Sequence, residues 1–584
     1  MKIKTLVMIS KNISFLLGFL LFSFTISAQE ITVSGNITDD ENLTLPGVNI
    51  MVKGTSIGSV TDIDGNYSIT AKQGDVLSFS FVGFNTKDIK VNGDKINVQL
   101  ESLAINLNEV VAIGYGNVRK KDITSSITSI KGEELTKIQS RGNFTESLQG
   151  LAAGVQVFNT SGSPGSTPTV IIRGATSING NPNPMYVVDG IPVGNNVNQI
   201  NAGDIESVEI LKDASATAIY GTQAANGVIL ITTKKAKMGE QNISLSASYG
   251  MQQLKKPEIA GAKEYMLVQN EKRFNSGQGE YALFSQEEIS NAKGTDYWDE
   301  AMRNIAPVYN MNLGFNGGSR KFRYNLNTGY FRQESQMDVG YWNRFTMRLN
   351  TEYHFNDYVK LGMNLNPRVE QWKNTPDIWG LISMDPTTPV YRPEEEQIGL
   401  NRYSVFQRSY HNDTWNPMGE IERYKVNNNN LLVSMNTNTY LNVLFLDGFA
   451  FNTQLGLDFS SQMQDRYDPE FVIDLGKESN LINSVSREID NSYGFVWNNT
   501  LSYIKTINEK HNINVLAGVV WEKSKTSDLW GYKQGIPNDS EFLRYLAAAT
   551  QEPNASGNDY INTALFSILG RVMYNYDHKY YVNL

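Results

Sequence analysis

The sequence predicts a mainly β protein that contains, in order, a small β-sandwich, a mixed α/β domain and the antiparallel strands of a transmembrane β-barrel. Three observations predict this fold class. The 584 residues include 48 Gly, 29 Tyr and 25 Phe but only 19% charged residues, and this mixture of turn formers and aromatic rings is typical of β structure. Short strand patterns separated by turn signals occupy the first part of the chain. Beyond residue 237, apolar and polar residues alternate over much longer stretches.

Residues 1–28 are typical of a secretory signal peptide. Three lysines form a basic region, residues 13–26 an apolar stretch, and cleavage is expected between Ala28 and Gln29. The apolar stretch is shorter than the ~20 residues that a membrane-spanning helix needs. Removal of this segment would leave 48 basic against 60 acidic residues, a net charge of −12 that argues against nucleic acid as a partner.

The chain has few residues suited to catalysis or metal binding. It has no Cys, which excludes disulfides, thiolate metal sites and cysteine nucleophiles. The four histidines, at positions 354, 411, 511 and 578, lack metal-ligand spacing. No paired-carboxylate or nucleophile motif is evident. We therefore expect no catalytic residue, no metal, no cofactor and no enzymatic activity.

Residues 29–101 are predicted to form the small β-sandwich. Six or seven short strands are separated by turn signals, such as those at residues 45–47 and 64–66. The run from Asp62 to Asn66 offers oxygen ligands for Ca²⁺, but the bidentate Glu of a complete loop is absent, so a hairpin turn is favoured. Residues 35–69 resemble the carboxypeptidase regulatory-type domain. The resemblance implies an extension domain without catalytic residues.

Residues 102–117 contain a short β-prone run with an acidic residue in front and glycines behind. Two interpretations remain open. The run is either one more edge strand, or a segment whose free backbone groups another protein captures by strand addition. Its residues are Asn108, Glu109, Val110, Val111, Ala112, Ile113, Gly114 and Tyr115.

Residues 118–237 are predicted to form a compact α/β domain with tight turns. The pattern contains too many short strands and helices for a linker. The expected helices cover residues 143–151 and 214–220, and the expected strands cover residues 155–157, 170–174, 185–193, 205–211 and 227–233.

Four motifs in these two segments carry a family resemblance. The sequences "LNEVVAIGYG", "IIRGA", "YVVDGIPV" and "DIESVEILKDASATAIYGTQAANGVILITTKK" resemble the TonB box and plug domain of SusC/RagA-type TonB-linked outer-membrane receptors. One departure is that Gln223 stands where the family usually has Arg, so an ion pair from plug to barrel at this position is not expected. The resemblance implies that the plug motif consists of Arg173, Gly174, Asp189, Gly190, Tyr220, Gly221, Asn226 and Gly227.

The resemblance also implies a location and a function. The protein would be a transporter in the cell outer membrane, with the sandwich and TonB box in the periplasm. It would import a glycan or a peptide beneath a SusD-type surface lipoprotein, and residues 108–115 would bind TonB, which passes on energy from the inner-membrane complex. The alternatives are a non-transporting surface receptor for binding or signalling, and a non-functional fragment of the transporter.

Residues 238–584 are predicted to be barrel strands in outer-membrane lipid. One face of the strand at residues 344–355 carries Phe345, Met347 and Leu349, while the other carries charged and polar residues. About eleven such strands follow one another, several longer than the ~9–11 residues that cross a bilayer. Short turns, as at residues 317–319, are expected on one side. Long insertions are expected on the other side, at residues 256–306, 372–427 and 523–560.

Aromatic residues in this region suggest two further roles. Tyr341, Trp342, Tyr503 and Trp521 are expected near strand ends, as interfacial girdles require. Rings in the long insertions could stack on sugars or peptide side chains, although for each ring alone loop packing is favoured over ligand contact. These candidates are Trp372, Trp379, Tyr391, Tyr403, Tyr410, Trp415 and Trp530.

The alternating pattern is still running when the sequence reaches Leu584. Members of the family have about 22 strands, roughly twice the number expected here. An open sheet in lipid would leave unpaired backbone groups at both edges. We therefore expect residues 238–584 to be a truncated barrel, with the remaining strands encoded elsewhere.

Overall fold

The computed structural model divides the chain into two compact units, with the division between Glu109 and Val110 in the sequence. The proposed signal peptide and its cleavage site lie outside the described residues. The structure describes residues 30–584 except 40–42, 56, 83, 101–109, 114–115, 120–125, 138–141, 160, 178–179, 195–196, 198–199, 237, 240, 278–281, 428 and 552.

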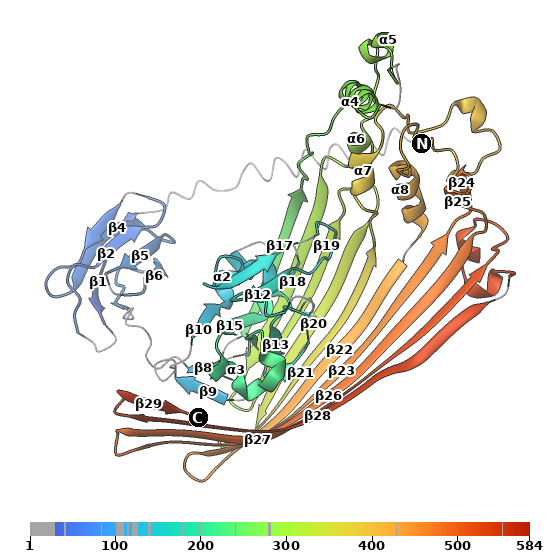
Figure 1. Ribbon diagram of the computed structural model, residues 1–584. Coiled ribbons are helices and arrows are strands. Elements are labelled where there is room, and N and C mark those ends of the chain that lie inside the picture. Colours follow the sequence, from blue (N-terminus) through green and yellow to red (C-terminus); the bar gives the residue numbers. More distant parts are fainter. Residues whose placement is uncertain are drawn as a thin grey trace, which may run out of the picture. The chain divides into compact units, whose positions relative to one another are not determined.

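The first unit contains two small sheets in its described part, as the sequence predicts (Figure 1). One sheet has the strand order β4-β1-β7 and the other β3-β2-β5-β6. Alternate residues point into a shared core, because Ile69 on β4 and Ile50 on β2 are buried while their neighbours are exposed. The strands are β1 (Glu30–Thr38), β2 (Asn49–Val52), β3 (Gly58–Val60), β4 (Asn66–Lys72), β5 (Val76–Ser80), β6 (Lys87–Lys90) and β7 (Val98–Gln99).

The acidic run before β4 forms a turn. The Asp62 Oδ1 atom accepts hydrogen bonds from the backbone N–H of Asp64 at 3.0 Å and of Asn66 at 2.8 Å. Gly65 has φ +76°, and a Cβ atom there would lie 2.8 Å from the Ile37 carbonyl oxygen. This carboxylate therefore holds the backbone of the turn.

The second unit begins with the α/β domain. Its larger sheet has the order β10-β15-β16-β13-β14, and β11 pairs with β12. The strands are β8 (Val110–Ile113), β9 (Gly116–Arg119), β10 (Ile127–Lys131), β11 (Val155–Phe158), β12 (Thr169–Ile172), β13 (Met185–Val188), β14 (Ile191–Pro192), β15 (Ile205–Leu211) and β16 (Val228–Thr233). The helices are α2 (Gly132–Lys137), η2 (Phe144–Leu148), η3 (Ala202–Asp204), α3 (Ala214–Thr217) and η4 (Ala218–Ala224).

The centre of this domain is the antiparallel pair β15 and β16. Ile210 lies opposite Ile229 and Val208 opposite Ile231, and all four side chains are buried in one apolar cluster. The predicted strand at residues 205–211 is confirmed, whereas β10 was not expected from the sequence. The predicted helix at residues 143–151 is reduced to the 3₁₀ turn η2, with Asn143 as its N-cap.

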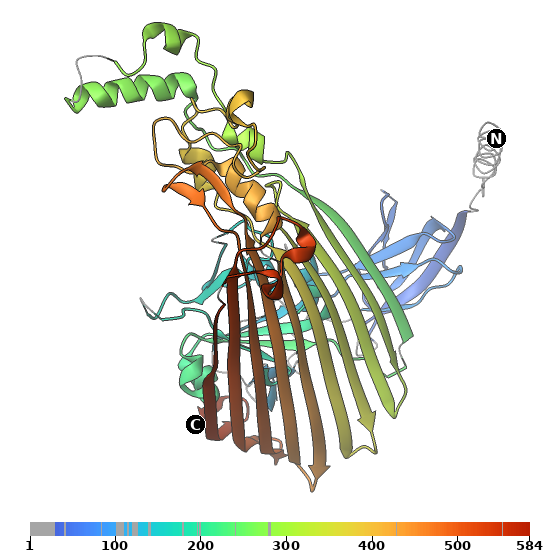
Figure 2. The ribbon, with the colours of Figure 1, turned by 90° about the vertical axis from the view of Figure 1, so that its right-hand side faces the viewer.

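The described residues after position 240 form an antiparallel sheet of eleven strands in sequence order, except that the small hairpin β24–β25 stands outside it (Figures 1 and 2). The sheet is open, with β17 and β29 at its edges. Its strands are β17 (Gln241–Gln252), β18 (Ala306–Gly318), β19 (Phe322–Glu334), β20 (Tyr341–His354), β21 (Val359–Lys373), β22 (Asn429–Phe445), β23 (Phe449–Asp468), β26 (Ser484–Ile507), β27 (His511–Gln534), β28 (Asn554–Tyr576) and β29 (Tyr580–Asn583). The mainly β fold class predicted from the sequence is confirmed.

The connections differ strongly between the two ends of this sheet (Figure 1). One end has short turns, and the other has the long insertions. The prediction of an insertion at residues 523–560 is wrong in extent, because β27 continues to Gln534 and β28 begins at Asn554. The elements of the insertions are α4 (Ala262–Asn275), α5 (Gln286–Ser290), α6 (Tyr297–Ala301), α7 (Trp379–Ser383), η5 (Glu394–Glu396), α8 (Pro417–Val426), β24 (Phe471–Asp474), β25 (Glu478–Asn480), η6 (Glu541–Leu543) and η7 (Leu546–Ala548).

None of the helices in the described part of the chain combines the length and the apolar character that crossing a membrane would require.

Candidate functional site

The large sheet buries its polar face and exposes its apolar face. On β20, the charged side chains of Arg344 and Arg348 are each 3% exposed, whereas Phe345 between them is 49% exposed. Soluble proteins show the opposite preference. The exposed apolar face is the surface expected to meet lipid, and the buried polar face is covered by the α/β domain. We call these the outward and the inward face.

Strand β20 holds a loop of the α/β domain on its inward face. The Arg344 Nη2 atom donates a hydrogen bond to the Asn201 Oδ1 atom at 2.9 Å. The Asn201 Nδ2 atom in turn donates to the Thr346 Oγ1 atom at 2.8 Å. Four residues further along β20, the Asn350 Nδ2 atom donates to the Lys234 carbonyl oxygen at 2.9 Å. The alternation that predicted an inward polar face thus supplies the contacts that hold the domain.

The tip of the hairpin β13–β14 reaches three other strands. Asp189 and Gly190 form its turn with φ values of +48° and +86°, in the left-handed region that Gly and Asp tolerate best. The Asp189 carbonyl oxygen accepts hydrogen bonds from the Gln454 Nε2 atom at 2.7 Å and the Asn438 Nδ2 atom at 3.4 Å. The Asn498 Nδ2 atom donates to the Gly190 carbonyl oxygen at 3.3 Å. Side-chain amides on β22, β23 and β26 therefore hold the backbone of one turn. We call these three hydrogen bonds the grip.

The Asp189 carboxylate ties this turn to the neighbouring strand β16 and to the inward face of the large sheet, which we call the wall. It accepts hydrogen bonds from the Thr233 N–H at 2.9 Å and the Thr233 hydroxyl at 2.7 Å. The Asn364 Nδ2 atom donates to it at 3.3 Å, and the Arg348 guanidinium lies 4.0 Å away. Arg348 also lies 3.7 Å from the Asp204 carboxylate, so one buried cation stands between two buried carboxylates. Buried charges of this kind are stable only when they are paired.

The other residues of the predicted plug motif lie away from the wall contacts of Asp189 and Gly190. Arg173 and Gly174 follow β12 with φ values of +59° and +109°. Gly227 has φ +92°, and a Cβ atom there would lie 2.8 Å from the Ile172 Cδ1 atom. Asn226 donates from its Nδ2 atom to the Asn181 carbonyl oxygen at 2.7 Å. These positions shape the turns of the domain.

Tyr220 and Gly221 lie in η4, close to the point where the motif departs from the family. The Tyr220 ring is 8% exposed and packs into the apolar cluster beside β16, and Gly221 has φ +66°. Gln223 is exposed and lines a cavity between the hairpin β13–β14 and the inward face of the sheet.

The predicted TonB box is described in part. Asn108, Glu109, Gly114 and Tyr115 lie outside the described residues. Val110–Ile113 form β8, which pairs antiparallel with β9 in a two-stranded sheet. Within the described part of the chain β8 has no second strand neighbour, so one of its edges offers backbone groups for strand addition. Both interpretations of this segment remain open.

The predicted aromatic roles need correction. Trp342 is not in an interfacial girdle, because it is 4% exposed on the inward face and a Cβ atom on Gly165 of the α/β domain would lie 2.7 Å from its ring. Trp521 lies within β27 rather than at its end. Of the predicted loop rings, Trp372 and Trp530 are on strands and Tyr403 is 2% exposed. The predicted candidates that are exposed in the insertions are Trp379, Tyr391, Tyr410 and Trp415.

Sequence reasoning missed the residues of the wall that grip the turn. Asn438, Gln454 and Asn498 are amides on the inward face of three neighbouring strands of the sheet. Their spacing identifies that face, but their partner at Asp189 and Gly190 is at least 249 residues away in the chain. A run of amides on the polar face of consecutive strands was the available signal.

Two family models match parts of the chain. The TonB-dependent Receptor Plug Domain matches residues 119–228, which include most of the α/β domain. The CarboxypepD_reg-like domain matches residues 33–112, which include most of the first unit.

Curated relatives match nearly the whole chain. TonB-dependent receptor P26 of Formosa agariphila is 32% identical over 566 residues, which are 94% of this chain and 55% of that protein. TonB-dependent receptor SusC of Bacteroides thetaiotaomicron is 28% identical over 606 residues, which are 98% of this chain and 58% of that protein. The chain therefore spans little more than half the length of the curated relatives it matches.

A solved structure has the same fold over most of the chain. The RagAB peptide importer in its "open-open" state matches with a TM-score of 0.68 at 23% identity. The match covers 81% of this chain and 55% of that chain.

Proposed function

Because this chain belongs to the SusC/RagA-type TonB-dependent receptors of the outer membrane, we propose that the protein imports a large nutrient through the barrel while the α/β domain serves as a movable plug. The grip on the Asp189–Gly190 turn supports this proposal most directly. It consists of hydrogen bonds from neutral amides to two carbonyl oxygens. Each such bond contributes only about 1 kcal/mol, so a pulling force can release the turn stepwise.

TonB binding is assigned to the segment that contains β8. An extended segment adds to a sheet edge through main-chain hydrogen bonds, with little dependence on its side chains. In this proposal β8 exchanges its pairing with β9 for pairing with TonB, which transmits energy from the inner-membrane complex. β8 and β9 are paired over four residue pairs, so few hydrogen bonds are lost when β8 leaves β9.

The nutrient and its surface partner follow from the family. A SusD-type lipoprotein would close the barrel from outside, and the cargo would be a peptide or a glycan. The RagAB importer, which shares the fold, imports peptides. Exposed rings on the insertions, such as Trp379 and Tyr391, offer faces for sugar rings or peptide side chains.

The test separates energised uptake from binding. Deletion of residues 109–113 should abolish uptake of the labelled nutrient and leave outer-membrane insertion and surface binding unchanged. Val111→Pro should reduce uptake more than Glu109→Ala, because Pro removes a backbone donor whereas Ala removes only a side chain. Normal uptake by the deletion variant would refute the energised mechanism, whereas surface binding without uptake by the unaltered protein would favour a surface receptor.

A further inference from the structure

A cavity of about 510 Å³ lies on the outward face of the large sheet, at the end that carries the long insertions. Its floor includes a row of residues across three strands, because Asn429 pairs with Asp465 and Asp465 with Arg487. The exposed apolar surface of the outward face begins at Val433, four residues after Asn429 on the same face of β22. We call this space the rim cavity.

Positive charge dominates the lining of the rim cavity. Among the described residues that line it, two carboxylates, those of Asp465 and Glu541, face six cations. Within the described structure, five of the six are ion-paired with carboxylates, so the attraction for an anion comes mainly from the one that is not, Lys373. The six cations are Lys373, Arg402, Lys425, Arg466, Arg487 and Arg544.

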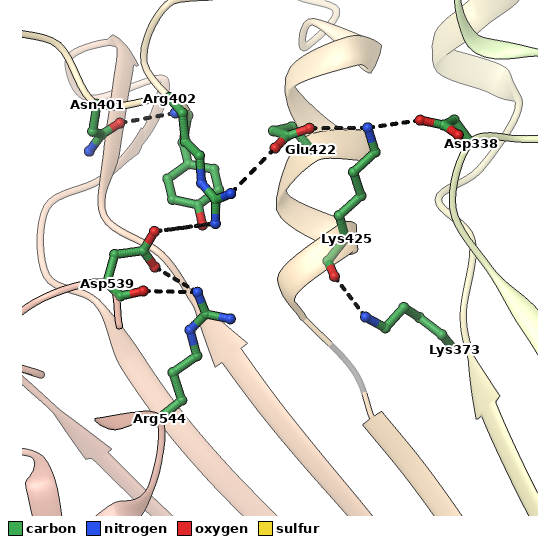
Figure 3. Close-up of polar contacts among 9 residues, drawn as sticks. Asp338, Lys373, Asn401, Arg402, Glu422, Lys425, Asp539 and Arg544 are labelled. Atoms are coloured by element: carbon green, nitrogen blue, oxygen red, sulfur yellow. Dashed lines mark hydrogen bonds and ion pairs between the residues drawn. The ribbon is translucent and has the colours of Figure 1, made fainter. Parts of the chain in front are cut away.

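Carboxylates outside the lining fix several of these cations in place (Figure 3). The Lys425 Nζ atom lies 2.9 Å from the Asp338 carboxylate and 3.2 Å from the Glu422 carboxylate. Asp539 lies 3.3 Å from the Arg402 guanidinium and 3.1 Å from that of Arg544. The network ties three connections of the sheet together, so the cations are held in position before any ligand binds.

Two donors at the cavity keep hydrogen-bonding capacity for a ligand. The Lys373 Nζ atom donates to the Lys425 carbonyl oxygen at 2.7 Å and makes no ion pair within the part of the chain that the structure describes. The Arg544 Nε atom is buried and has no hydrogen-bond partner among the described residues. Ammonium and guanidinium groups with free donors are the usual ligands of phosphate oxygens.

We propose that the rim cavity binds the phosphate group of a lipid in the surrounding outer leaflet. The cavity opens on the same face as the apolar surface, so a lipid can place its chains against residues such as Val433 and its phosphate beside Lys373. A nutrient on its way through the barrel would instead follow the inward face. The inference rests on the outer-membrane location and is independent of transport, so either proposal can fail alone.

The experiment measures lipid binding by the purified full chain in detergent. The probes are a bis-phosphorylated glycolipid, the same glycolipid without phosphate, and inorganic pyrophosphate. We expect the phosphorylated lipid to bind best, and Lys373→Gln and Arg544→Gln each to weaken its binding about tenfold. Lys373→Arg should retain binding, because it keeps the cation.

The matched control is Lys505→Gln, which removes a cation from the opposite end of β26 and should leave lipid binding unchanged. Thermal unfolding of each variant separates lost binding from lost folding. Equal binding of the two lipids, or equal binding by the Lys373 and Lys505 variants, would refute the site. Tight binding of pyrophosphate without binding of the phosphorylated lipid would refute the lipid as its ligand.

Discussion

Single residues account for the way in which the plug is held. Asp189 is required twice, since its carbonyl oxygen accepts hydrogen bonds from the wall and its carboxylate accepts them from Thr233. The turn that presents both groups needs positive φ at two consecutive positions, which Asp189 and Gly190 supply at low strain. The Asp189–Gly190 motif therefore has a structural role, because it places two backbone carbonyl oxygens where the side-chain amides of the sheet can bind them.

The first prediction concerns the shortest bond in this grip. Gln454→Ala removes the amide that donates to the Asp189 carbonyl oxygen at 2.7 Å. The loss of about 1 kcal/mol should loosen the plug roughly fivefold and raise the sensitivity of cells to antibiotics too large for porins. The control is Gln464→Ala, on the same face of β23, where the described residues provide no hydrogen bond from this side chain to the plug. Equal sensitivity of the two variants would contradict the proposed grip.

The second prediction concerns Glu478 in the insertion between β23 and β26. Its side chain is buried near the Arg423 guanidinium at 3.8 Å and accepts a hydrogen bond from the Asn416 N–H at 3.1 Å. Burial raises the pKa of Glu478 from 4.5 to about 7. Between these values the unfolded segment loses its proton while the folded segment keeps it. The stability of the folded insertion should therefore fall by about 1.4 kcal/mol per pH unit as pH rises from about 4.5 to 7.

Limited proteolysis of the insertions across this pH range measures the effect. Wild type should become easier to cleave as pH rises toward 7 and then change little. Glu478→Gln has no proton to lose and should show a flat profile. An unchanged slope in that variant would assign the pH dependence to another group.

At the scale of elements, the face of a strand was easier to predict than its ends. The alternation on β20 correctly separates Arg348 from Leu349 because side chains alternate strictly along a strand. The length of β27 was underestimated because residues 522–528 are polar on both faces and the pattern there no longer distinguishes strand from loop. Strand β10 was missed because a five-residue strand gains its stability from pairing with β15, about eighty residues later.

The third prediction tests the assignment of the outward face. Leu349→Arg places a charge at the middle of β20 on the face expected to contact lipid. Such a charge costs about 2–4 kcal/mol near the centre of a bilayer. The yield of folded protein in the outer membrane, measured by heat-dependent mobility on gels, should fall sharply. Asp357→Arg, in the exposed turn after β20, should assemble normally, and equal yields would mean that this face does not meet lipid.

For the whole molecule, local patterns predicted the parts but not their contacts. The sandwich, the plug and the barrel strands each follow from patterns within a few tens of residues. The contacts that join plug to barrel are between residues far apart in the chain, as with Gly190 and Asn498, which are 308 positions apart. Patterns within one sequence give the face on which each residue lies and leave its partner undetermined. The sequence therefore predicted one side of the candidate site, the Asp189–Gly190 turn. It did not predict the amides of the sheet that hold this turn.

The division of the chain into two units leads to the last prediction. The sandwich has its own core, with Val33, Ile50 and Phe79 fully buried. Residues 29–101 expressed alone should therefore fold, with a β-type circular dichroism spectrum and one cooperative thermal transition. A domain of this size has only about 3–5 kcal/mol of stability, and Phe79→Ala should remove about as much. Val60→Ala, at a position 58% exposed on β3, should leave the transition nearly unchanged. An unfolded isolated sandwich would mean that the first unit depends on the second for its stability.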